Sequence, residues 1–281
     1  MQSTFPHHAL VVEGGAMRGI FATGVLDAWL EHNYNPFDMH FGVSAGATNI
    51  AAFLCHQHKR NYTVITDYSC RADFISYGRF ARGGHLFDLD WLWRKTISEI
   101  RLDLATFAKN SAPFFVTATN AHTGQAEYLQ ATADNLEDIL KASCALPIAY
   151  RDFVPFDGAY YTDGGIADSI PVRKAYQMGA KRITVVLSQP LGYRKKPSRL
   201  GWLLKFALKQ HGALATTMTK RWADYNASLD FIMSPPKDCQ IDVIAPGSDF
   251  AISRTTRDLA KLDAGYKMGI DAGRLVCNST R

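Results

Sequence analysis

Short apolar runs alternate with longer helical patterns along most of the chain. Apolar positions at helical spacing run from Ile20 to Glu31, and a second helical pattern runs from Ala45 to His56. The short runs are typical of buried parallel strands, which helices cover on both faces of a sheet. The pattern predicts a three-layer α/β/α fold with a mostly parallel central sheet. The predicted strands are Ala9–Glu13, Met39–Val43, Phe114–Thr119, Ile183–Ser188 and Ile241–Ala245.

Length and composition fit one domain with a large core. The chain has 281 residues, of which 47% are hydrophobic. α/β folds of this size are commonly single domains. The sequence has no internal repeat and no low-complexity tract, so we expect a single domain over residues 1–281.

A serine stands between two glycines where the second predicted strand passes into a helix. The segment Gly42-Val43-Ser44-Ala45-Gly46 has the Gly-x-Ser-x-Gly pattern of a nucleophile elbow. In such an elbow a sharp turn projects the serine hydroxyl beside a helix N-terminus. The two glycines leave room for the strained backbone of the serine. The pentapeptide alone is a modest signal, so its weight depends on the motifs around it.

A glycine-rich turn joins the first predicted strand to the helix that follows it. Its sequence is Glu13-Gly14-Gly15-Ala16-Met17-Arg18-Gly19. Backbone N–H groups at the positive end of a helix dipole suit an anion, either a phosphate or a developing oxyanion. A plain tight turn is the alternative. A dinucleotide site has less support, because its fingerprint needs glycine where Ala16 stands and an acid after the second strand, whereas Asp38 precedes that strand.

An acidic residue followed by two glycines lies downstream, at Asp163-Gly164-Gly165. This is a loop signal, and it is compatible with a plain turn. In a serine hydrolase a carboxylate on such a loop can accept the proton of the serine hydroxyl. Three other aspartates lie close in sequence and are weaker candidates, because none precedes two glycines. They are Asp152, Asp157 and Asp168.

In this order and spacing, the three motifs resemble those of the patatin-like phospholipase family. Phe115–Asn120 and the turn after it resemble the central strand of the family. Ala142–Pro147 resembles its Ala-Ser-x-Ala-x-Pro helix end, and Asp163 through Val172 resembles the segment with the catalytic acid. The resemblance covers residues 8–190. Beyond these core motifs lie a basic amphipathic segment at 193–221 and a predicted C-terminal strand and helix at 241–275.

The resemblance implies a patatin-like fold and a catalytic Ser–Asp dyad. Ser44 would attack an ester carbonyl, and Asp163 would accept its proton and later activate the water that releases the acyl group. Backbone N–H groups of the glycine-rich loop would hold the oxyanion. No cofactor and no metal are expected. The site residues implied are Ser44 and Asp163 as the dyad, Gly14, Gly15, Ala16, Met17, Arg18 and Gly19 around the oxyanion hole, Gly42 and Gly46 in the elbow, and Gly164 and Gly165 in the acid loop.

Two residues of the glycine-rich loop, Ala16 and Arg18, need separate comparison with the family pattern. Ala16 stands where the family usually has a third glycine, and it leaves its N–H available, so we expect a functional but slightly tighter oxyanion hole. Arg18 stands where the family usually has arginine. It would place a cation beside a lipid phosphate or a fatty carboxylate, or it would hold the loop in place.

Histidine remains an alternative base. Nine histidines are present, and His40 and His56 lie nearest the elbow in sequence. His40 falls within a predicted strand. His56 falls near the end of the helix, about three turns from Ser44. The resemblance favours the dyad over a histidine-based triad.

The net charge of +5 is concentrated in one segment. Between Tyr193 and Arg221 eight basic residues occur without an acid, and Leu200 to Leu208 would form an apolar stripe on a helix flanked by Trp202 and Phe206. Three interpretations stay open: an interfacial helix in peripheral contact with anionic membrane, a lid over an acyl pocket, and an ordinary surface helix. Nucleic acid is not an expected partner, because no recognised nucleic-acid motif accompanies the charge. The sequence does not indicate an oligomeric state.

An aromatic-rich region lies between the elbow helix and the next predicted strand. Tyr77–Trp93 contains Phe80, Phe87, Trp91 and a Gly-Gly pair. Folds of this class often insert a substrate cap at this place. The region is expected to form an apolar wall for an acyl chain or to pack as part of the core, and the sequence favours neither.

Cysteine usage and the N-terminus predict a cytoplasmic protein, peripheral at the membrane if the basic segment binds lipid. The five cysteines have no metal-ligand spacing and are odd in number, which suits a reducing compartment. The first eight residues lack the charged and apolar regions of a signal peptide. No run of 18 apolar residues occurs, so a membrane span is not expected.

The function predicted from these residues is hydrolysis of a lipid ester through an acyl-Ser44 intermediate, as in a phospholipase A or a lysophospholipase. A transacylase would use the same first half-reaction and remains open. A catalytically idle module that binds a lipid or a nucleotide is the alternative of a different class, and the presence of both Ser44 and Asp163 argues against it. Headgroup, acyl length and regiospecificity are not indicated by the sequence.

Overall fold

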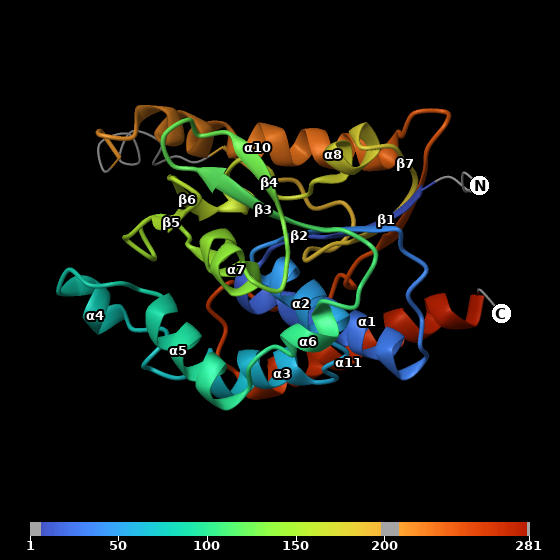
Figure 1. Ribbon diagram of the computed structural model, residues 1–281, viewed down its shortest axis with the longest axis horizontal. Coiled ribbons are helices and arrows are strands. Elements are labelled where there is room, and N and C mark those ends of the chain that lie inside the picture. The colour runs from blue at the N-terminus through green and yellow to red at the C-terminus, as the bar shows by residue number, and fades with distance from the viewer. Residues whose placement is uncertain (1–6, 198–207, 280–281) are drawn as a thin grey trace.

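A computed structural model describes residues 7–197 and 208–279 of the chain. Within these residues eight strands form one sheet, and helices cover both of its faces (Figure 1). This is the three-layer α/β/α arrangement that the alternating pattern predicts. The strands are β1 (His7–Val12), β2 (Met39–Val43), β3 (Phe114–Asn120), β4 (Ala126–Gln130), β5 (Val154–Phe156), β6 (Ala159–Asp163), β7 (Ala180–Val186) and β8 (Gln240–Ile244).

The sheet has a parallel half and an antiparallel half. Its order is β5-β6-β3-β2-β1-β7-β8, and β4 pairs with β3 off this path. Strands β3, β2, β1, β7 and β8 run parallel to one another. Strands β4 and β6 pair antiparallel with β3, and β5 pairs antiparallel with β6. All five strands predicted from apolar runs lie in the parallel half.

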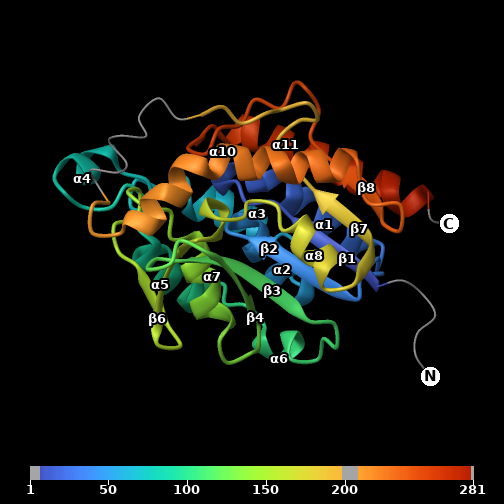
Figure 2. The same ribbon diagram turned by 90° about the horizontal axis from the view of Figure 1, so that it is seen from above.

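Helices lie in two layers, with α8 and α10 on one face and α1, α2 and α11 on the other (Figures 1 and 2). Connecting segments add short helices, among them the first turn of the glycine-rich loop. The helices are η1 (Ala16–Gly19), α1 (Ile20–Glu31), α2 (Ala45–Leu54), α3 (Arg60–Thr63), η2 (Val64–Tyr68), α4 (Tyr77–Ala81), α5 (Leu89–Glu99), α6 (Leu104–Phe107), α7 (Leu136–Cys144), η3 (Gly164–Ile166), α8 (Val172–Gln177), α10 (Gly212–Met233) and α11 (Leu259–Ser279).

The central strands are apolar on both sides because each side faces a helical layer. In β1, Leu10 and Val12 pack into the core that includes α1 and α2. Ala9 and Val11 point to the opposite core, which includes Val172 of α8. Side chains alternate across a strand, so an unbroken apolar run is what a doubly covered strand requires.

The apolar pattern does not predict the antiparallel strands, because β4 is only partly buried along its length, β5 has three residues, and β6 contains tyrosine, threonine and aspartate in place of an aliphatic run. β5 and β6 form a hairpin in which Phe156 pairs with Ala159 across Asp157-Gly158. Asp157 has φ 45° and Gly158 φ 75°, as the two central residues of a hairpin turn with positive φ require. The aspartate of the Asp-Gly-Gly motif was expected in a loop. It is instead the last residue of β6, followed by η3.

The apolar stripe of the basic segment lies largely outside the described residues. Residues 198–207 contain most of that predicted helix, so its three interpretations stay predictions. On its near side Arg194 forms an ion pair with Asp230 of α10 at 2.6 Å. In the described part of the chain, no helix is both long enough and apolar enough to cross a membrane.

The C-terminal helix α11 packs so closely on α1 that glycine is required at the contact. A Cβ atom on Gly269 would lie 2.1 Å from the carbonyl oxygen of Phe21. A Cβ on Gly24 of α1 would lie 2.2 Å from the carbonyl oxygen of Tyr266. The two helix backbones therefore touch, and α11 is fixed against the layer that also holds the elbow helix α2.

We predict that Gly269→Val lowers the free energy of unfolding by at least about 2 kcal/mol, because backbone atoms must move to admit the side chain. Asp271→Val is the matched control, since it adds the same side chain on the exposed face of α11; it should change stability by no more than about 0.5 kcal/mol. Urea denaturation of both variants measures the difference. Equal stability of the two variants would contradict the close packing.

Candidate active site

Strand β3 sets the relative position of the serine and aspartate of the sequence motifs. Val43, the last residue of β2, pairs with Thr117 of β3. Asp163, the last residue of β6, pairs with Ala118, the next residue of β3. β4 occupies the other edge of β3 at these positions, so β2 and β6 approach the same edge from opposite directions and meet end to end. Ser44 and Asp163 are therefore neighbours.

Ser44 occupies a strained backbone conformation at the start of α2. Its φ is 52° and its ψ is −125°, a combination costing about 1–3 kcal/mol that is typical of functional sites. The flanking glycines permit the close packing around it. A Cβ on Gly42 would lie 2.5 Å from the Cα of Ala47, and one on Gly46 would lie 2.4 Å from the carbonyl oxygen of Val12. Both glycines of the motif are thus required sterically.

Ser143 holds the elbow against β3. The backbone N–H of Ser44 donates to Ser143 Oγ at 2.8 Å. Ser143 Oγ in turn donates to the carbonyl oxygen of Thr117 at 2.6 Å. Ser143 is fully buried in the last turn of α7. This relay fixes the peptide of Ser44 to the strand that also positions Asp163.

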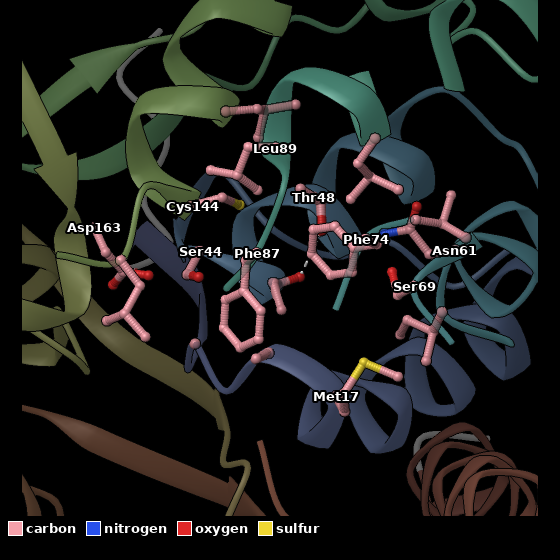
Figure 3. Close-up of a pocket in the computed structure, with 18 of the residues that line it drawn as sticks. Met17, Ser44, Thr48, Asn61, Ser69, Phe74, Phe87, Leu89, Cys144 and Asp163 are labelled. Atoms are coloured by element: carbon pink, nitrogen blue, oxygen red, sulfur yellow. Dashed lines mark hydrogen bonds between the residues drawn. The ribbon is translucent and has the colours of Figure 1, made fainter. Parts of the chain in front are cut away.

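The Ser44 side chain lies beside the Asp163 carboxylate, and both line the same end of the pocket (Figure 3). Asp163 Oδ1 also accepts the backbone N–H of Gly165 at 2.8 Å. Burial raises the pKa of the Asp163 carboxyl, and the Arg221 cation, the Ser44 hydroxyl and the Gly165 N–H each offset part of that rise. A carboxylate with a raised pKa is a stronger proton acceptor than an exposed aspartate.

A thiol also lies beside Ser44. Cys144, at the end of α7, lines the same pocket as Ser44 (Figure 3), and burial raises the pKa of its thiol, with a further rise from the negative charge of Asp163. The thiolate is the reactive form of cysteine. Cys144 is therefore a poor nucleophile at neutral pH, and the hydroxyl is the better placed group.

The glycine-rich loop presents backbone donors next to Ser44. Among the backbone hydrogen bonds of the described residues, the N–H groups of Gly15, Ala16 and Met17 have no acceptor. They lie at the start of η1, which continues into α1, so the positive end of the helix dipole adds to them. Ala16 has φ 50°, in the left-handed region where the family's usual glycine is unstrained.

Arg18 and Gly19 fix the glycine-rich loop through contacts with neighbouring segments. Arg18 is 7% exposed, and its guanidinium donates to Ser188 Oγ from Nη2 at 3.2 Å. It also lies 4.0 Å from Glu13. A Cβ on Gly19 would lie 2.9 Å from that of Ala45, so the loop packs directly on the elbow. These contacts fit the loop-holding interpretation of Arg18.

A pocket of about 140 Å³ connects these groups to an apolar interior. Ser44, Asp163, Gly165 and residues 14–17 line it. Figure 3 shows Ser44 and Asp163 side by side, with phenylalanine rings further along. The apolar lining includes Val64, Ile65, Phe74, Ile75, Phe87 and Leu89.

The region 77–93 contributes to both the wall and the core. Phe87, Leu89 and Leu92 line the pocket and are also buried members of one apolar cluster. Tyr77 is 59% exposed. The two interpretations of this region, acyl wall and core packing, thus apply to the same side chains.

The histidines and the other aspartates lie away from the pocket. Its lining, as far as the described residues go, contains no histidine, and Asp163 is its one aspartate. His40 is buried within β2, where burial lowers its pKa to about 4, and His56 is exposed beyond α2. Within the described ranges, no three His, Cys, Asp or Glu side chains gather as a metal site would need.

Three residues at the site were not singled out from sequence. Ser143 belongs to a motif that the resemblance includes. Its hydrogen bonds to Ser44 and Thr117 could not be predicted without knowing how β3 pairs with β2. Arg221 was counted in the basic segment, whose three interpretations stayed open, and it lines the pocket beside Gly165. Arg254, which also lines the pocket, lies in a loop between β8 and α11 and carries no sequence signal.

Comparison with known families and proteins adds to this geometry. A family model described as "Patatin-like phospholipase" matches residues 10–176, and a second, described as a domain of unknown function (DUF6363), matches residues 211–280. An uncharacterized protein of Escherichia coli K12, YjjU, is 35% identical over 273 residues, covering 95% of this chain and 76% of the relative. A crystal structure of VipD from Legionella pneumophila aligns over 98% of this chain and 67% of its own, with 13% identity and a TM-score of 0.47.

We predict that Asp163→Asn raises the thermal midpoint near neutral pH. The raised pKa means that the folded state holds the proton more tightly than the unfolded state, so stability falls as pH rises through the folded-state pKa. Asparagine removes the buried charge and keeps an oxygen that accepts from Gly165. The gain should be constant above that pKa and should shrink as the pH is lowered below it toward the ordinary pKa of an aspartate.

Asp157→Asn, at the exposed hairpin turn, is the matched control for the stability measurement. Its thermal midpoint should equal that of the parent protein at each pH, because asparagine also adopts the left-handed conformation. Differential scanning calorimetry across the acidic and neutral range measures both variants. A lower midpoint for Asp163→Asn at neutral pH would contradict the buried-charge interpretation.

Proposed function

This chain belongs to the patatin-like phospholipase family, and from that premise we propose that it is a lipid acyl hydrolase that uses Ser44 and Asp163 as a catalytic dyad. The observation that carries the proposal is the position of the Ser44 side chain beside the buried Asp163 carboxylate in an apolar pocket. A nucleophile with an adjacent base is the minimum required for acyl transfer.

In the first half-reaction Ser44 Oγ attacks the ester carbonyl while Asp163 takes the hydroxyl proton. The tetrahedral oxyanion forms beside the N–H groups of Gly15, Ala16 and Met17, which are already oriented and need no reorganisation. Collapse of the intermediate breaks the ester C–O bond. Asp163 returns its proton to the leaving alcohol, and the acyl group stays on Ser44.

In the second half-reaction Asp163 removes a proton from water, which attacks the acyl-Ser44 carbonyl. A second tetrahedral intermediate forms in the same oxyanion hole. When it collapses, the proton returns to Ser44 Oγ and the fatty acid leaves. The apolar walls around Phe74, Phe87 and Leu89 suit the acyl chain, because burial of methylene groups contributes about 0.8 kcal/mol each.

We predict that Ser44→Ala abolishes turnover of a short-chain p-nitrophenyl ester, because no covalent intermediate can form. Asp163→Asn should lower kcat by about 10²–10⁴-fold, the typical value of a general base. Ser98→Ala, on the exposed face of α5, is the matched serine control and should leave kcat unchanged. Spectrophotometric rates of the purified proteins provide the comparison.

A fluorophosphonate probe separates the hydrolase from an idle binding module. The parent protein should be labelled, and Ser44→Ala should not, because only an activated serine reacts. Absence of labelling in the parent protein would favour the binding module. Full turnover by Asp163→Asn together with loss in His56→Ala would contradict the dyad and restore the histidine alternative.

A further inference from the structure

Four basic side chains from four separate segments lie close enough to interact electrostatically, and two of them, Arg221 and Arg254, line the pocket. They are Arg18 of η1, Lys195 in the loop after β7, Arg221 of α10 and Arg254 in the loop before α11. Burial lowers the pKa of Arg18, Lys195 and Arg221, and the positive charge of Arg254 lowers the pKa of each further. The proposed mechanism requires none of these charges.

The inner pair of this cation cluster is held by a buried acid. Glu13 accepts the backbone N–H of Ser188 at 2.7 Å and the hydroxyl of Tyr225 at 3.2 Å, and it lies 4.0 Å from Arg18. The ammonium of Lys195 lies 4.0 Å from the centre of the Tyr225 ring. Both oxygens of Glu13 therefore have partners, and the acid positions Arg18 together with Tyr225, the ring that Lys195 contacts.

The outer pair faces the pocket. Arg221 and Arg254 line it together with Ser44. Arg221 Nε donates to the carbonyl oxygen of Gly165, so its guanidinium is anchored on the side of the pocket where Asp163 lies. Arg254 is half-buried, and within the described residues it forms no hydrogen bond or ion pair. Its donors are available to a ligand.

The local charge does not balance. Three arginines that stay charged near neutral pH, Arg18, Arg221 and Arg254, stand against two carboxylates, Glu13 and Asp163, and burial raises the pKa of Asp163. Burial and the neighbouring arginines lower the pKa of Lys195 to about 6. Cations held together at such a cost are typical of anion-binding sites, and arginine in particular presents paired donors that match phosphate.

We propose that Arg254 and Arg221, supported by Lys195 and Arg18, bind the phosphate group of a glycerophospholipid substrate. This inference rests on the proposed function and specifies its substrate class. The apolar pocket suits the acyl chain, so an anion held on the Asp163 side belongs to the alcohol portion of the ester. In a glycerophospholipid that portion carries the phosphate.

The inference also gives a role to the C-terminal part of the chain. Arg221 and Arg254 both lie within residues 211–280, the part matched by the family model of unknown function. Ser44 and Asp163 lie within the patatin-like part. The C-terminal segment would therefore supply headgroup recognition to a catalytic site built by the N-terminal segment.

The test compares two single-chain esters with the same oleoyl group, lysophosphatidic acid and monooleoylglycerol, both below their aggregation concentrations. Arg254→Gln should lower the ratio of kcat/KM for the phosphorylated ester over the neutral ester by about tenfold, the value of one charge-assisted hydrogen bond. Arg254→Lys should restore part of the ratio. Arg257→Gln removes the same charge from an exposed position of the same loop and should leave both rates unchanged.

Equal losses on the two esters would overturn the inference, because the arginine would then act on Asp163 or on the oxyanion and not on the headgroup. An unchanged ratio in Arg254→Gln would also overturn it. The thermal midpoint of Arg254→Gln should not fall below that of the parent protein, because the substitution removes a charge that repels Arg18, Lys195 and Arg221.

A binding measurement separates this inference from the proposed function. Calorimetry with glycerol 3-phosphate and with inorganic phosphate, on Ser44→Ala protein, should show binding of glycerol 3-phosphate that Arg254→Gln abolishes. This result would support the phosphate site even if no ester were hydrolysed. Absence of glycerol 3-phosphate binding would contradict a headgroup site. Binding of inorganic phosphate by a protein whose kcat/KM is the same for the phosphorylated and the neutral ester would also contradict it.

Discussion

The register of β3 is the constraint on which the site depends. Thr117 pairs with the end of β2 and Ala118 with the end of β6, so one strand brings together two residues that are far apart in sequence. Strand pairing, and not the conformation of a flexible loop, therefore places Asp163 next to the elbow serine. Because side chains and peptides along β3 are fixed by backbone pairing on both edges, the hydroxyl and the carboxylate are positioned before any substrate arrives, which is the preorganisation that acyl transfer requires.

This arrangement has a cost in stability. Ser44 and Ala16 both have positive φ, Asp163 is buried with its pKa raised, and four basic side chains lie close together, two of them in the pocket wall. Each feature is unfavourable for the folded state by itself. The surrounding core offsets them: β1 and β2 are buried on both faces, and α11 locks onto α1 through backbone contact at Gly269. The proposed site residues thus coincide with the conformations and charges that are least favourable for folding, as is common for active sites.

Much of the parallel half of the fold follows from local patterns. A strand covered on both faces must be apolar throughout, as Ala9–Val12 is, and the glycines of the elbow mark places where a Cβ would collide with backbone. The order of the three motifs, together with the resemblance, was enough to predict the patatin-like fold. The Asp157-Gly158 hairpin was also readable in principle, since that dipeptide favours the positive φ values observed.

The remainder of the site depends on tertiary neighbours. Ser143 gains its role only when α7 brings it between Thr117 and the Ser44 peptide. Arg254 is one of many arginines in the sequence, and only the course of the loop before α11 places it at the pocket. Lys195 stands in a basic segment, which suggests an exposed side chain, but it is half-buried over the Tyr225 ring. Periodicity and composition cannot identify such residues, because their environment comes from segments distant in sequence.

The most direct test of the account is to identify the atom that carries the acyl group during turnover. Acid quenching of the enzyme with a fatty-acid p-nitrophenyl ester, followed by proteolysis and mass spectrometry, should place one acyl group on the peptide that contains Ser44. Cys144 lies beside Ser44 and belongs to a different peptide, so the two are separable. An acyl group on Cys144, or active enzyme with no acyl group on the Ser44 peptide at any quench time, would contradict the account.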